Sequence, residues 1–431
     1  MIHRSLTQAT TFALAMLVTG CATARPLVSG LSTADSTAIR SDVMFLASDA
    51  LEGRGTGTPG NDSAAAWIAR RYGKLGLIQP FPGYIQRFDA RSAQDAHQGA
   101  TRSRATQNVV GILRGTDPSL RNQYLVIGAH FDHLGRSSES SLDPGATDAI
   151  RNGADDNASG TATVLELARL LAANPPRRSV IFIAFSGEEL GLLGSRWFVE
   201  NPPVPLASLT AMLNFDMVGR LRDDKLIVYG TATATELPDL LQAANVASGE
   251  GRLEITGVGD GFGPSDHSSF YGKDIPVLHF FTDLHDDYHR ATDDADKLNA
   301  SGTARVVDLA HRVTRAIADR PARLAFVRSA GPPAMTGSRQ GSQTYLGSIP
   351  DMAAGNSPGL RLTGVRAGSP ADLGGLRAGD VIVDFGGSPV KDLYTYTDAL
   401  YAHKPGDAVK IIVLRGTERV QLMITLGKRG G

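Results

Sequence analysis

The feature that most constrains the fold of this chain is a regular alternation of short apolar runs and helical patterns that begins at residue 124. Each apolar run has the length of a buried strand, and a helical pattern such as that over residues 161–173 separates one run from the next. This alternation predicts an α/β fold, a three-layer sandwich around a mostly parallel central sheet. We expect strands at residues 124–129, 179–185, 211–215 and 275–281, and further helices at 39–50, 62–75 and 301–319.

The C-terminal part of the chain has a different composition and a different pattern of apolar residues. Residues 329–343 are rich in Pro, Gly and Ser, which is the composition of a linker. Beyond this segment, short apolar runs alternate with glycine turns, and this pattern predicts a small β-rich domain. We therefore expect one domain over residues 37–328 and a second over residues 344–431. In the second domain, strands are expected at residues 360–365, 381–385, 409–414 and 420–426.

The N-terminus has the layout of a secretory signal. Basic residues precede an apolar stretch over residues 11–18, which is too short to cross a bilayer as a mature helix. The following Val18-Thr19-Gly20-Cys21 resembles the bacterial lipobox, in which the cysteine becomes the lipidated first residue. We expect a signal peptide over residues 1–20 and a tether over residues 21–36 behind a lipid anchor on Cys21. The alternative is an ordinary cleaved signal peptide.

The lipid anchor sets the expected location of the protein. No later segment is apolar enough to span a bilayer, so we expect contact with the membrane only through the lipid on Cys21. Ala22 stands where an Asp often signals retention in the inner membrane, and this favours the outer membrane. We therefore expect a lipid-anchored protein of the periplasm in the cell envelope.

Charge and cysteine content exclude several classes of partner and site. The 43 Lys and Arg residues balance 44 Asp and Glu residues, so the net charge of -1 provides no field that attracts polyanions. A nucleic-acid partner is therefore not expected. The single cysteine excludes a disulfide framework within the chain and any site built from several cysteines. Any metal ion must be held by histidines and carboxylates.

Histidines and acidic residues cluster at the ends of the predicted strands. Six of the ten histidines lie between His130 and His289, and most of the acidic residues in question directly follow an apolar run. In open α/β sheets, ligands bind beyond the carboxyl ends of the strands, so this placement predicts a site. The residues concerned are His130, Asp132, Asp155, Asp156, Glu188, Glu189, Asp216, Asp266, His267, Asp287, His289 and Asp293.

The residue types in this cluster suit a pair of metal ions. His130 and Asp132 lie on one side of an extended chain, where a carboxylate can orient a metal-bound imidazole. Glu188 and Glu189 follow a strand that looks buried, and two like charges there need a cation or a raised pKa. Two histidines, three carboxylates and one free Glu suit two cations that activate water. Taken singly, each motif also fits a hydrogen-bonded histidine, a helix cap or a solvated acidic pair.

The motifs together resemble those of the co-catalytic dizinc aminopeptidases of the bacterial leucyl aminopeptidase and aminopeptidase Y type. They are HFDH at 130–133, GADDNASG at 153–160, FSGEELGLLGS at 185–195, NFDMVG at 214–219, and SDH and YH near 266 and 289. They occur in the family's order, and the likeness covers roughly residues 41–318. The resemblance implies a zinc exopeptidase-like fold that binds two Zn²⁺ ions.

The resemblance also assigns roles. His130 and Asp216 are implied to hold one Zn²⁺, Glu189 and His289 the other, and Asp156 to bridge them. Glu188 matches the general base, and Asp132 matches the acid that orients the first histidine. Five further residues are either outer partners and substrate contacts or ordinary packing residues, namely His133, Asp155, Asp266, His267 and His285.

One departure from the family pattern is visible. Many relatives carry an inserted protease-associated domain before the first histidine, whereas only about residues 91–107 occupy that place here. The stretch 91–106 is polar, has no apolar period and is predicted to be a surface loop. Restriction of the substrate by such an inserted domain is therefore not expected.

The C-terminal region resembles a PDZ domain from about residue 343 to residue 426. The sequence YLGS at 345–348 matches the carboxylate-binding loop, GSPA at 368–371 a turn, and LRAGDVI at 376–382 the segment after it. Such a domain binds a peptide or a protein C-terminus by adding a strand to a sheet edge. The alternative is that the domain has a structural role alone.

The expected function is zinc-dependent hydrolysis of the N-terminal peptide bond of peptides that have a free N-terminus. A zinc-bridging water is expected to attack the carbonyl, with Glu188 moving the proton. Two alternatives remain. One is a single-zinc acyltransferase of the glutaminyl cyclase type, and the other is a catalytically degenerate envelope protein that binds partners through the PDZ-like region.

Overall fold

The structure is a computed structural model, and its described residues cover most of both predicted domains. The predicted signal peptide beyond Met1, the lipobox Cys21 and the 329–343 linker lie outside the described residues. The domain boundaries drawn from the sequence stay predictions. The described residues are 1, 33–90, 104–136, 141, 143, 145–328, 344–350, 358–365, 368–391, 395–396, 399–400 and 402–428.

An eight-stranded mixed sheet forms the centre of the N-terminal domain, in the order β1-β2-β4-β3-β5-β8-β6-β7. The central strands β4, β3, β5 and β8 run parallel, and the predicted strands all lie in this part. On the flanks, β2 is antiparallel to both β1 and β4, and β6 is antiparallel to β8. The strands are β1 Ile85–Ala90, β2 Arg104–Leu113, β3 Tyr124–His130, β4 Ser179–Phe185, β5 Leu209–Phe215, β6 Lys225–Tyr229, β7 Glu254–Val258 and β8 Val277–Phe281.

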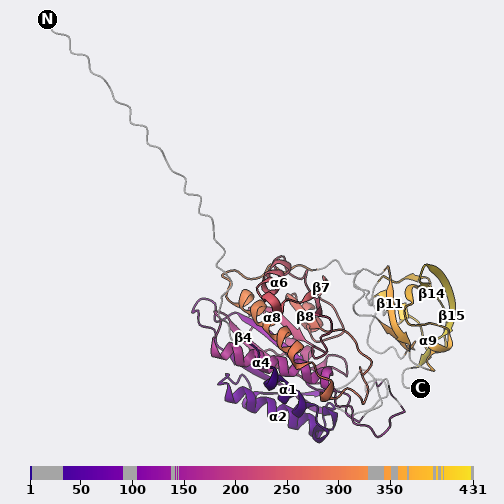
Figure 1. Ribbon diagram of the computed structural model, residues 1–431, viewed down its shortest axis with the longest axis horizontal. Helices are drawn as coiled ribbons and strands as arrows, with labels where there is room; N and C mark the ends of the chain where they lie inside the picture. Colours follow the sequence, from indigo (N-terminus) through magenta and orange to yellow (C-terminus); the bar gives the residue numbers. More distant parts are fainter. Residues whose placement is uncertain are drawn as a thin grey trace. The chain divides into compact units, whose positions relative to one another are not determined.

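Helices cover both faces of this sheet, as the predicted sandwich requires. Along β3, Leu125 and Ile127 pack into the core shared with α1, α2, α4, α6 and α8, while Val126 packs into the core shared with α5 and α7. Helices α1, α4 and α8 contact one another on the first face (Figure 1). The helices are α1 Ser36–Leu46, α2 Pro59–Lys74, α4 Gly160–Ala173, α5 Leu193–Glu200, α6 Leu237–Val246, α7 His267–Tyr271 and α8 Ala300–Ala318.

Helix starts follow their caps. Asp35 accepts hydrogen bonds from the backbone of Thr37 and Ala38, and Thr58 and Asn299 cap α2 and α8 in the same way. These helices therefore begin earlier than the apolar pattern predicts, because a cap residue carries no apolar signal. Shorter helical turns cover Asp49–Arg54, Pro82–Tyr84, Ala154–Ser159, Leu206–Ser208, Gly249–Gly251 and Ala295–Lys297.

The prediction that residues 91–106 form a loop is wrong at its C-terminal end. Strand β2 begins at Arg104, which pairs with Ala90 of β1. The strand carries buried polar residues, which hide its apolar pattern in the sequence. Each of these side chains has a hydrogen-bonding partner, so burial costs little. The pairs are Thr106 with Asn61, Gln107 with Asp62 and Asn108 with Gln86.

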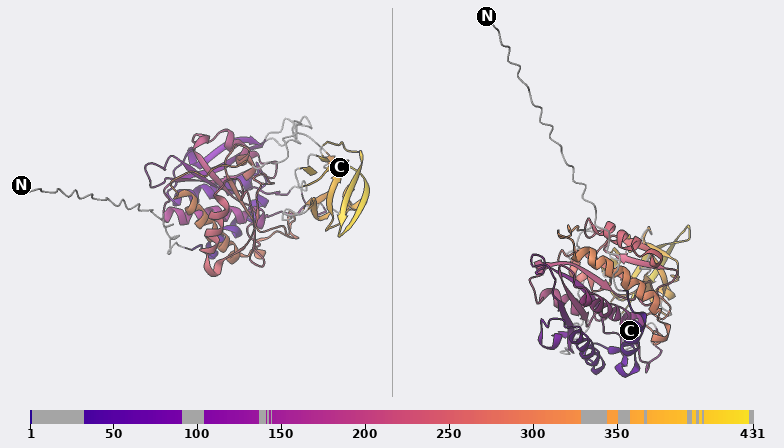
Figure 2. Two further views of the ribbon diagram at one scale, coloured as in Figure 1. Left: turned by 90° about the horizontal axis from the view of Figure 1, so that it is seen from above. Right: turned by 60° about the vertical axis from the view of Figure 1, so that its left-hand side comes forward.

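The C-terminal region is β-rich, as predicted, and Figure 2 shows its strands in yellow. Its buried core includes Leu346, Ile382, Phe385, Ile411 and Val413. Strand β12 pairs with β11, β13 and β14, and β14 pairs with β15. The elements are β9 Thr344–Tyr345, β10 Ser348–Pro350, β11 Leu360–Val365, α9 Pro370–Leu373, β12 Val381–Phe385, β13 Ser388–Pro389, β14 Ala408–Arg415, β15 Glu418–Thr425 and β16 Gly427–Lys428.

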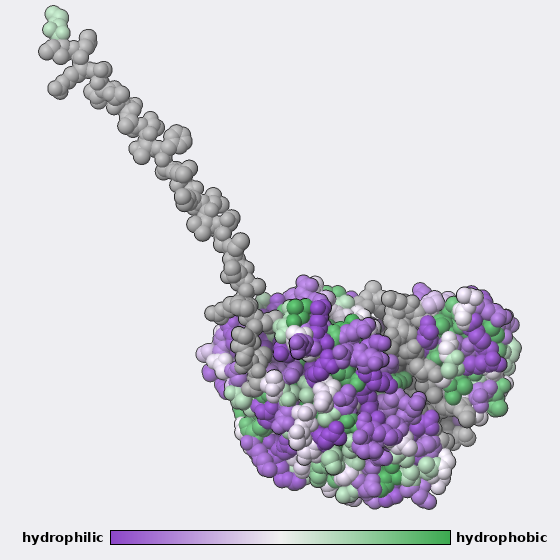
Figure 3. Space-filling model, in the orientation of Figure 1, coloured by the Kyte–Doolittle hydropathy of each residue, from purple (hydrophilic) through white to green (hydrophobic). Residues whose placement is uncertain are grey.

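Among the described residues, no helix has both the length and the apolar character needed to cross a membrane. On the face drawn in Figure 3, hydrophobic residues are interspersed with hydrophilic ones. This mixture is ordinary for a protein surface in water.

Candidate metal centre

The candidate site lies where the parallel strands of the central sheet end. His130 is the last residue of β3, Asp216 directly follows β5, and the pair Glu188–Glu189 comes shortly after β4. Asp156 comes from the helical turn that precedes α4, and His289 from the loop after β8. The carboxyl ends of parallel strands thus bring together residues that are separated in the sequence by up to about half of the domain.

The first group of donor atoms surrounds the His130 ring. Its Nε2 lies 3.2 Å from Asp216 Oδ1 and 3.3 Å from Asp156 Oδ1. On the other side of the ring, Nδ1 lies 3.1 Å from the backbone carbonyl of Asp132 and 3.8 Å from its carboxylate. Asp132 is itself held, because its carboxylate accepts from Thr56 Oγ1 at 2.7 Å and from the Glu188 backbone at 3.3 Å. The ring of His130 is therefore oriented through Asp132.

The second group of donor atoms surrounds the His289 ring. Its Nε2 lies 3.2 Å from Asp156 Oδ2 and 3.4 Å from Glu189 Oε2. His133 Nδ1 belongs to the same group of donor atoms, because it lies 2.8 Å from Glu189 Oε1 and 3.8 Å from Asp156 Oδ2. Asp156 thus turns one carboxylate oxygen toward each group, which is the geometry of a bridging carboxylate.

The charges at the site fit a pair of cations. In the part of the chain that the structure describes, no Lys or Arg forms an ion pair with Asp156, Glu188, Glu189 or Asp216. Burial, together with the charges of Glu189 and Asp216, raises the pKa of Glu188 well above its ordinary value. Although burial opposes it, the negative charge of Asp216 and Glu188 raises the pKa of His130. Imidazole nitrogens and carboxylate oxygens in this number suit two zinc ions.

A cavity opens beside the two groups. Asp156, Glu188 and Glu189 line one part of it. Tyr288 stacks on His289 with its ring centre 3.9 Å away. The rest of the lining is mostly apolar or aromatic, with Met217, Tyr229, Pro264, Phe281, Leu284 and Tyr288, and it also includes Ser265 and His279.

Comparison with known families agrees with this geometry. Residues 108–314 match the model of peptidase family M28, and residues 344–426 match that of the PDZ domain. The chain carries an M28 peptidase domain followed by a PDZ domain. The resemblance drawn from the sequence motifs is thereby confirmed for both domains.

Curated relatives match the M28 domain. Leupeptin-inactivating enzyme 1 of Streptomyces exfoliatus is 31% identical over 233 residues, which cover 53% of this chain and 47% of that protein. Aminopeptidase YwaD of Bacillus subtilis is 28% identical over 180 residues, which cover 41% of this chain and 36% of that protein. The chain thus spans less than half the length of these relatives.

Solved structures show the same fold. The zinc aminopeptidase BSAP from Bacillus subtilis has 18% identity and a TM-score of 0.55, covering 70% of this chain and 99% of that chain. A glutaminyl cyclase from Bacteroides thetaiotaomicron, bound to N-acetylhistamine, has 17% identity and a TM-score of 0.55, covering 66% and 99%. At these identities the likeness concerns the fold alone, which a peptidase and a cyclase share.

Asp155 and His285 lie behind the metal centre of the M28 domain rather than within it. Asp155 Oδ2 lies 3.1 Å from His285 Nε2, and Asp155 Oδ1 accepts from the Gly219 backbone at 2.6 Å. Asp293 continues this network, because its Oδ2 accepts from the backbone of both Asp155 and Asp156, at 2.9 and 3.1 Å. These bonds fix the loop that carries Asp156 to the segment that carries His289.

Asp266 and His267 are buried next to the cavity but belong to neither group of donor atoms. The His267 ring stacks on His279 at 4.4 Å, and burial, with the neighbouring His279, lowers its pKa well below the ordinary value. His267 is therefore a neutral packing residue. Burial raises the pKa of Asp266 to about 7, which places an uncharged carboxyl group beside the site at lower pH.

Two residues of the site escaped the sequence prediction, Arg54 and Thr56. Arg54 is fully buried and donates to the carbonyls of Phe131 at 2.7 Å, Asn152 at 2.7 Å and Gly153 at 3.0 Å. Burial lowers its pKa to about 10, so it stays charged at neutral pH. It ties together the loops that carry Asp132 and Asp156. The only signal in the sequence is an Arg between two glycines, and Arg is ordinarily a surface residue.

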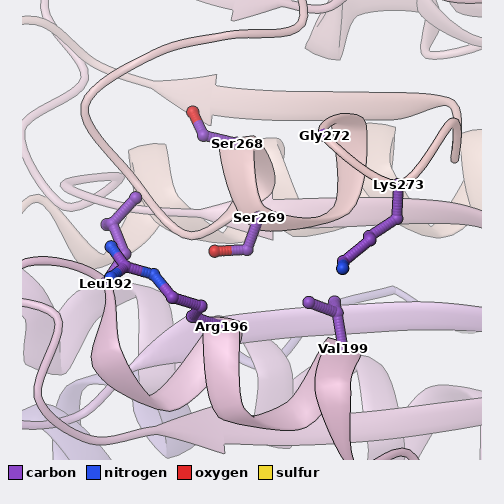
Figure 4. Close-up of a pocket in the computed structure, with 7 residues that line it drawn as sticks. All are labelled: Leu192, Arg196, Val199, Ser268, Ser269, Gly272 and Lys273. Carbon is purple, nitrogen blue, oxygen red and sulfur yellow. The ribbon is translucent and has the colours of Figure 1, made fainter. Parts of the chain in front are cut away.

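A second hollow of about 230 Å³ lies between α5 and α7 (Figure 4). Val199, Ser269 and Lys273 point toward the space between the two helices. Ser195 and Ser269 are hydrogen-bonded at 2.9 Å, and Arg196 donates to the Gly191 carbonyl at 2.9 Å. These bonds support the turn that carries Glu188 and Glu189, and no acidic or imidazole side chain lines this hollow.

Proposed function

We propose that the M28 domain is a two-zinc aminopeptidase that removes the first residue of peptides with a free N-terminus. The observation that carries this proposal is the carboxylate of Asp156, which presents Oδ1 to His130 and Oδ2 to His289. In this assignment Asp216 completes the first ion site and Glu189 the second. Bound zinc supplies a water molecule of lowered pKa and stabilises negative charge on the carbonyl oxygen.

Glu188 is assigned the proton transfer. Its side chain lines the cavity beside Asp156 and Glu189 and belongs to neither group of donor atoms. A carboxylate of raised pKa is suited to take the proton of the attacking water. Glu188 then passes this proton to the nitrogen of the leaving amine, which balances the hydrolysis. Asp132 contributes by holding the His130 ring in place.

The cavity supports a preference for an apolar first residue. Met217, Tyr229, Phe281 and Leu284 line the cavity and can contact a side chain such as that of Leu or Phe, while the carboxylates of the same cavity attract a free ammonium group.

The test is a substrate panel with the full chain loaded with zinc. We expect release of the first residue from Leu-initiated amides and peptides, and none from the same substrates with an acetylated N-terminus. Gln-initiated peptides distinguish the proposed aminopeptidase from an enzyme of the glutaminyl cyclase type. Formation of a cyclised N-terminus from Gln without cleavage of the Leu substrates would contradict the proposal.

For the PDZ domain we propose binding of a peptide C-terminus at the loop Tyr345-Leu346-Gly347-Ser348. Gly347 has a φ of 85°, and a Cβ there would lie 2.2 Å from the Ser369 Cβ, so the loop packs too closely for a larger residue. Fluorescence anisotropy with C-terminal peptides is expected to show binding that weakens when the carboxylate is amidated. Equal binding of both forms would argue against a carboxylate-binding loop.

We also propose that Cys21 carries a lipid that holds the protein at the cell envelope. The lipobox pattern supports this proposal. Replacement Cys21→Ser is expected to move the protein from the membrane fraction to the soluble fraction or to leave it unprocessed. Wild-type protein that is free of lipid in the periplasmic fraction would contradict the anchor.

A further inference from the structure

His133 contacts the second ion site but has no role in the function proposed above. It is buried, with only 2% of its surface exposed, and its Nδ1 lies 2.8 Å from Glu189 Oε1. Its ring lies 5.8 Å from the ring of His289, at an angle of 70°. At this distance Nδ1 either donates a hydrogen bond to the carboxylate or shares a metal ion with it.

The other ring nitrogen distinguishes these two readings. His133 Nε2 is buried and has no hydrogen-bond partner within the described part of the chain. If Nδ1 bound a metal ion, the proton of the neutral ring would sit on Nε2 as a buried N–H group without an acceptor. If Nδ1 carries the proton, only a lone pair is left without a partner. Buried N–H groups without an acceptor are rarer than unused acceptors, so the proton belongs on Nδ1.

The bond from His133 determines how Glu189 faces the ion site. With Oε1 engaged by His133, the remaining Oε2 is the oxygen that lies 3.4 Å from His289 Nε2. Asp156 Oδ2 lies 3.2 Å from the same nitrogen. One oxygen of Glu189, one of Asp156 and the His289 nitrogen therefore converge on a common position.

The His133 ring packs against the backbone of Gly153. Gly153, which has a φ of 56°, lies so close that a Cβ there would come within 2.4 Å of His133 Cγ. Only glycine fits this combination of left-handed backbone and close approach. The His133 ring therefore packs directly against the backbone of the loop that carries Asp156.

We propose that His133 is a positioning residue of the second ion site, which donates Nδ1–H to Glu189 and thereby presents Oε2 to the ion. This inference rests on the two-ion site of the proposed function. Asp132 orients the first ligand His130, and the next residue along the chain orients Glu189. The segment that follows β3 thus serves both ion sites through two consecutive residues.

Three replacements of His133 test the inference through metal affinity. An Asn side chain places its amide N–H close to the position of Nδ1, whereas a Gln amide reaches toward the position of Nε2. The variants His133→Asn, His133→Gln and His133→Ala are titrated with Zn²⁺ against a competing chelator. We expect the alanine and glutamine variants to lose about 10- to 100-fold in affinity at one of the two binding steps, and the asparagine variant to regain most of it.

The Co²⁺-loaded proteins give a second readout, because their absorption spectra report the atoms bound to the ion. The Asn variant is expected to keep the wild-type spectrum. Loss of affinity in all three variants with a changed spectrum would overturn the inference in favour of His133 as a ligand, and wild-type affinity in all three would remove its role. If the alanine variant does not fold, the comparison of Asn with Gln decides.

The metal titration is independent of peptidase activity. If wild-type protein binds two ions but cleaves no peptide, the proposed function fails while the His133 comparison stands. If wild-type protein binds no second ion, the two-ion site itself is wrong.

Discussion

Two buried acidic sites, one in each domain, differ in how their charge is compensated. In the PDZ domain, Asp380 is fully buried, and its oxygens accept from Arg415 Nε and Nη2 at 2.8 Å each and from the Arg377 backbone at 2.9 Å. In the M28 domain, Asp156 and Asp216 face imidazoles and other carboxylates. A buried carboxylate that is paired with an Arg of the chain has a structural role, whereas a group of carboxylates that faces imidazoles and other carboxylates is suited to bind cations.

The buried Arg54 supports this distinction. It lies beneath the metal centre, yet its guanidinium donates to backbone carbonyls such as those of Phe131 and Gly153 rather than to the carboxylates. It shapes the ligand loops and leaves the donor atoms of Asp156 free for ions. Asp380 is neutralised by Arg415, whereas Arg54 does not neutralise the acidic cluster of the M28 domain.

Removal of the metal ions is expected to have the largest effect, and it should affect the M28 domain but not the PDZ domain. Treatment with 1,10-phenanthroline is expected to abolish peptide cleavage, and added Zn²⁺ to restore it. At free zinc 1,000-fold above Kd, its removal should cost the M28 domain about 4 kcal/mol of stability against unfolding, measured by calorimetry. Peptide binding by the PDZ domain should be unchanged. Full activity in the presence of the chelator would show that the acidic cluster needs no cation.

Replacement of the proposed base is expected to have the next largest effect. Glu188→Gln keeps the size of the side chain and removes its ability to accept a proton, so turnover should fall by about 100-fold or more. Metal analysis should still find both ions, because Glu188 belongs to neither group of donor atoms. Glu200→Gln, at the exposed end of α5, is the matched control. Near-normal turnover of Glu188→Gln with both ions bound would remove the residue from this role.

The strands of the sheet that position this site were predictable where the chain is most deeply buried. Strands β3, β4 and β5 are rich in Val, Ile, Leu and Phe because both of their faces are covered. The flanking β7 is partly exposed, and β2 carries buried polar residues, so neither shows a clear apolar run. A run of apolar residues in the sequence therefore indicates that a strand is buried. It does not indicate with which strands it pairs.

The site residues were predictable to the extent that their signals are local. His130 and Asp216 directly follow apolar runs, Glu189 comes shortly after one, and the structure brings them together with Asp156 and His289. Arg54 escaped prediction because its partners are backbone carbonyls from distant segments, which leave no trace in residue type. The motif HFDH likewise does not reveal which acidic group each of its side chains contacts.

The ion pair of the PDZ domain offers a test on the structural side of the comparison. Asp380→Asn removes the charge that faces Arg415, and a broken buried pair costs 3–5 kcal/mol. Because the Arg415 side chain is 29% exposed, solvent compensates part of this, and we expect a loss of roughly 1–3 kcal/mol in calorimetry. The double replacement Asp380→Asn with Arg415→Met should recover part of the loss. Zinc affinity should be unaffected, and a change in it would contradict the separation of the two sites.

A third kind of buried titratable group is His311 of α8, which forms no ion pair with any residue that the structure describes and whose charged neighbours are arginines. Burial, together with the charges of Arg315, Arg312 and Arg169, lowers its pKa from 6.5 to about 4, so the folded protein holds it neutral. Between these two values the unfolded chain binds a proton that the folded chain does not. The stability that comes from this difference is present above pH 6.5 and is lost progressively as the pH falls toward 4.

The variant His311→Leu tests this pH dependence. It cannot take up the proton, and it also removes Nε2, which has no hydrogen-bond partner among the described residues. Urea unfolding at pH 7 and pH 5 should therefore show wild type losing about 1–2 kcal/mol more than the variant. Equal losses in wild type and variant would mean that the folded protein also binds a proton on His311 at pH 5. A buried cationic histidine would then be tolerated there without a counter-charge.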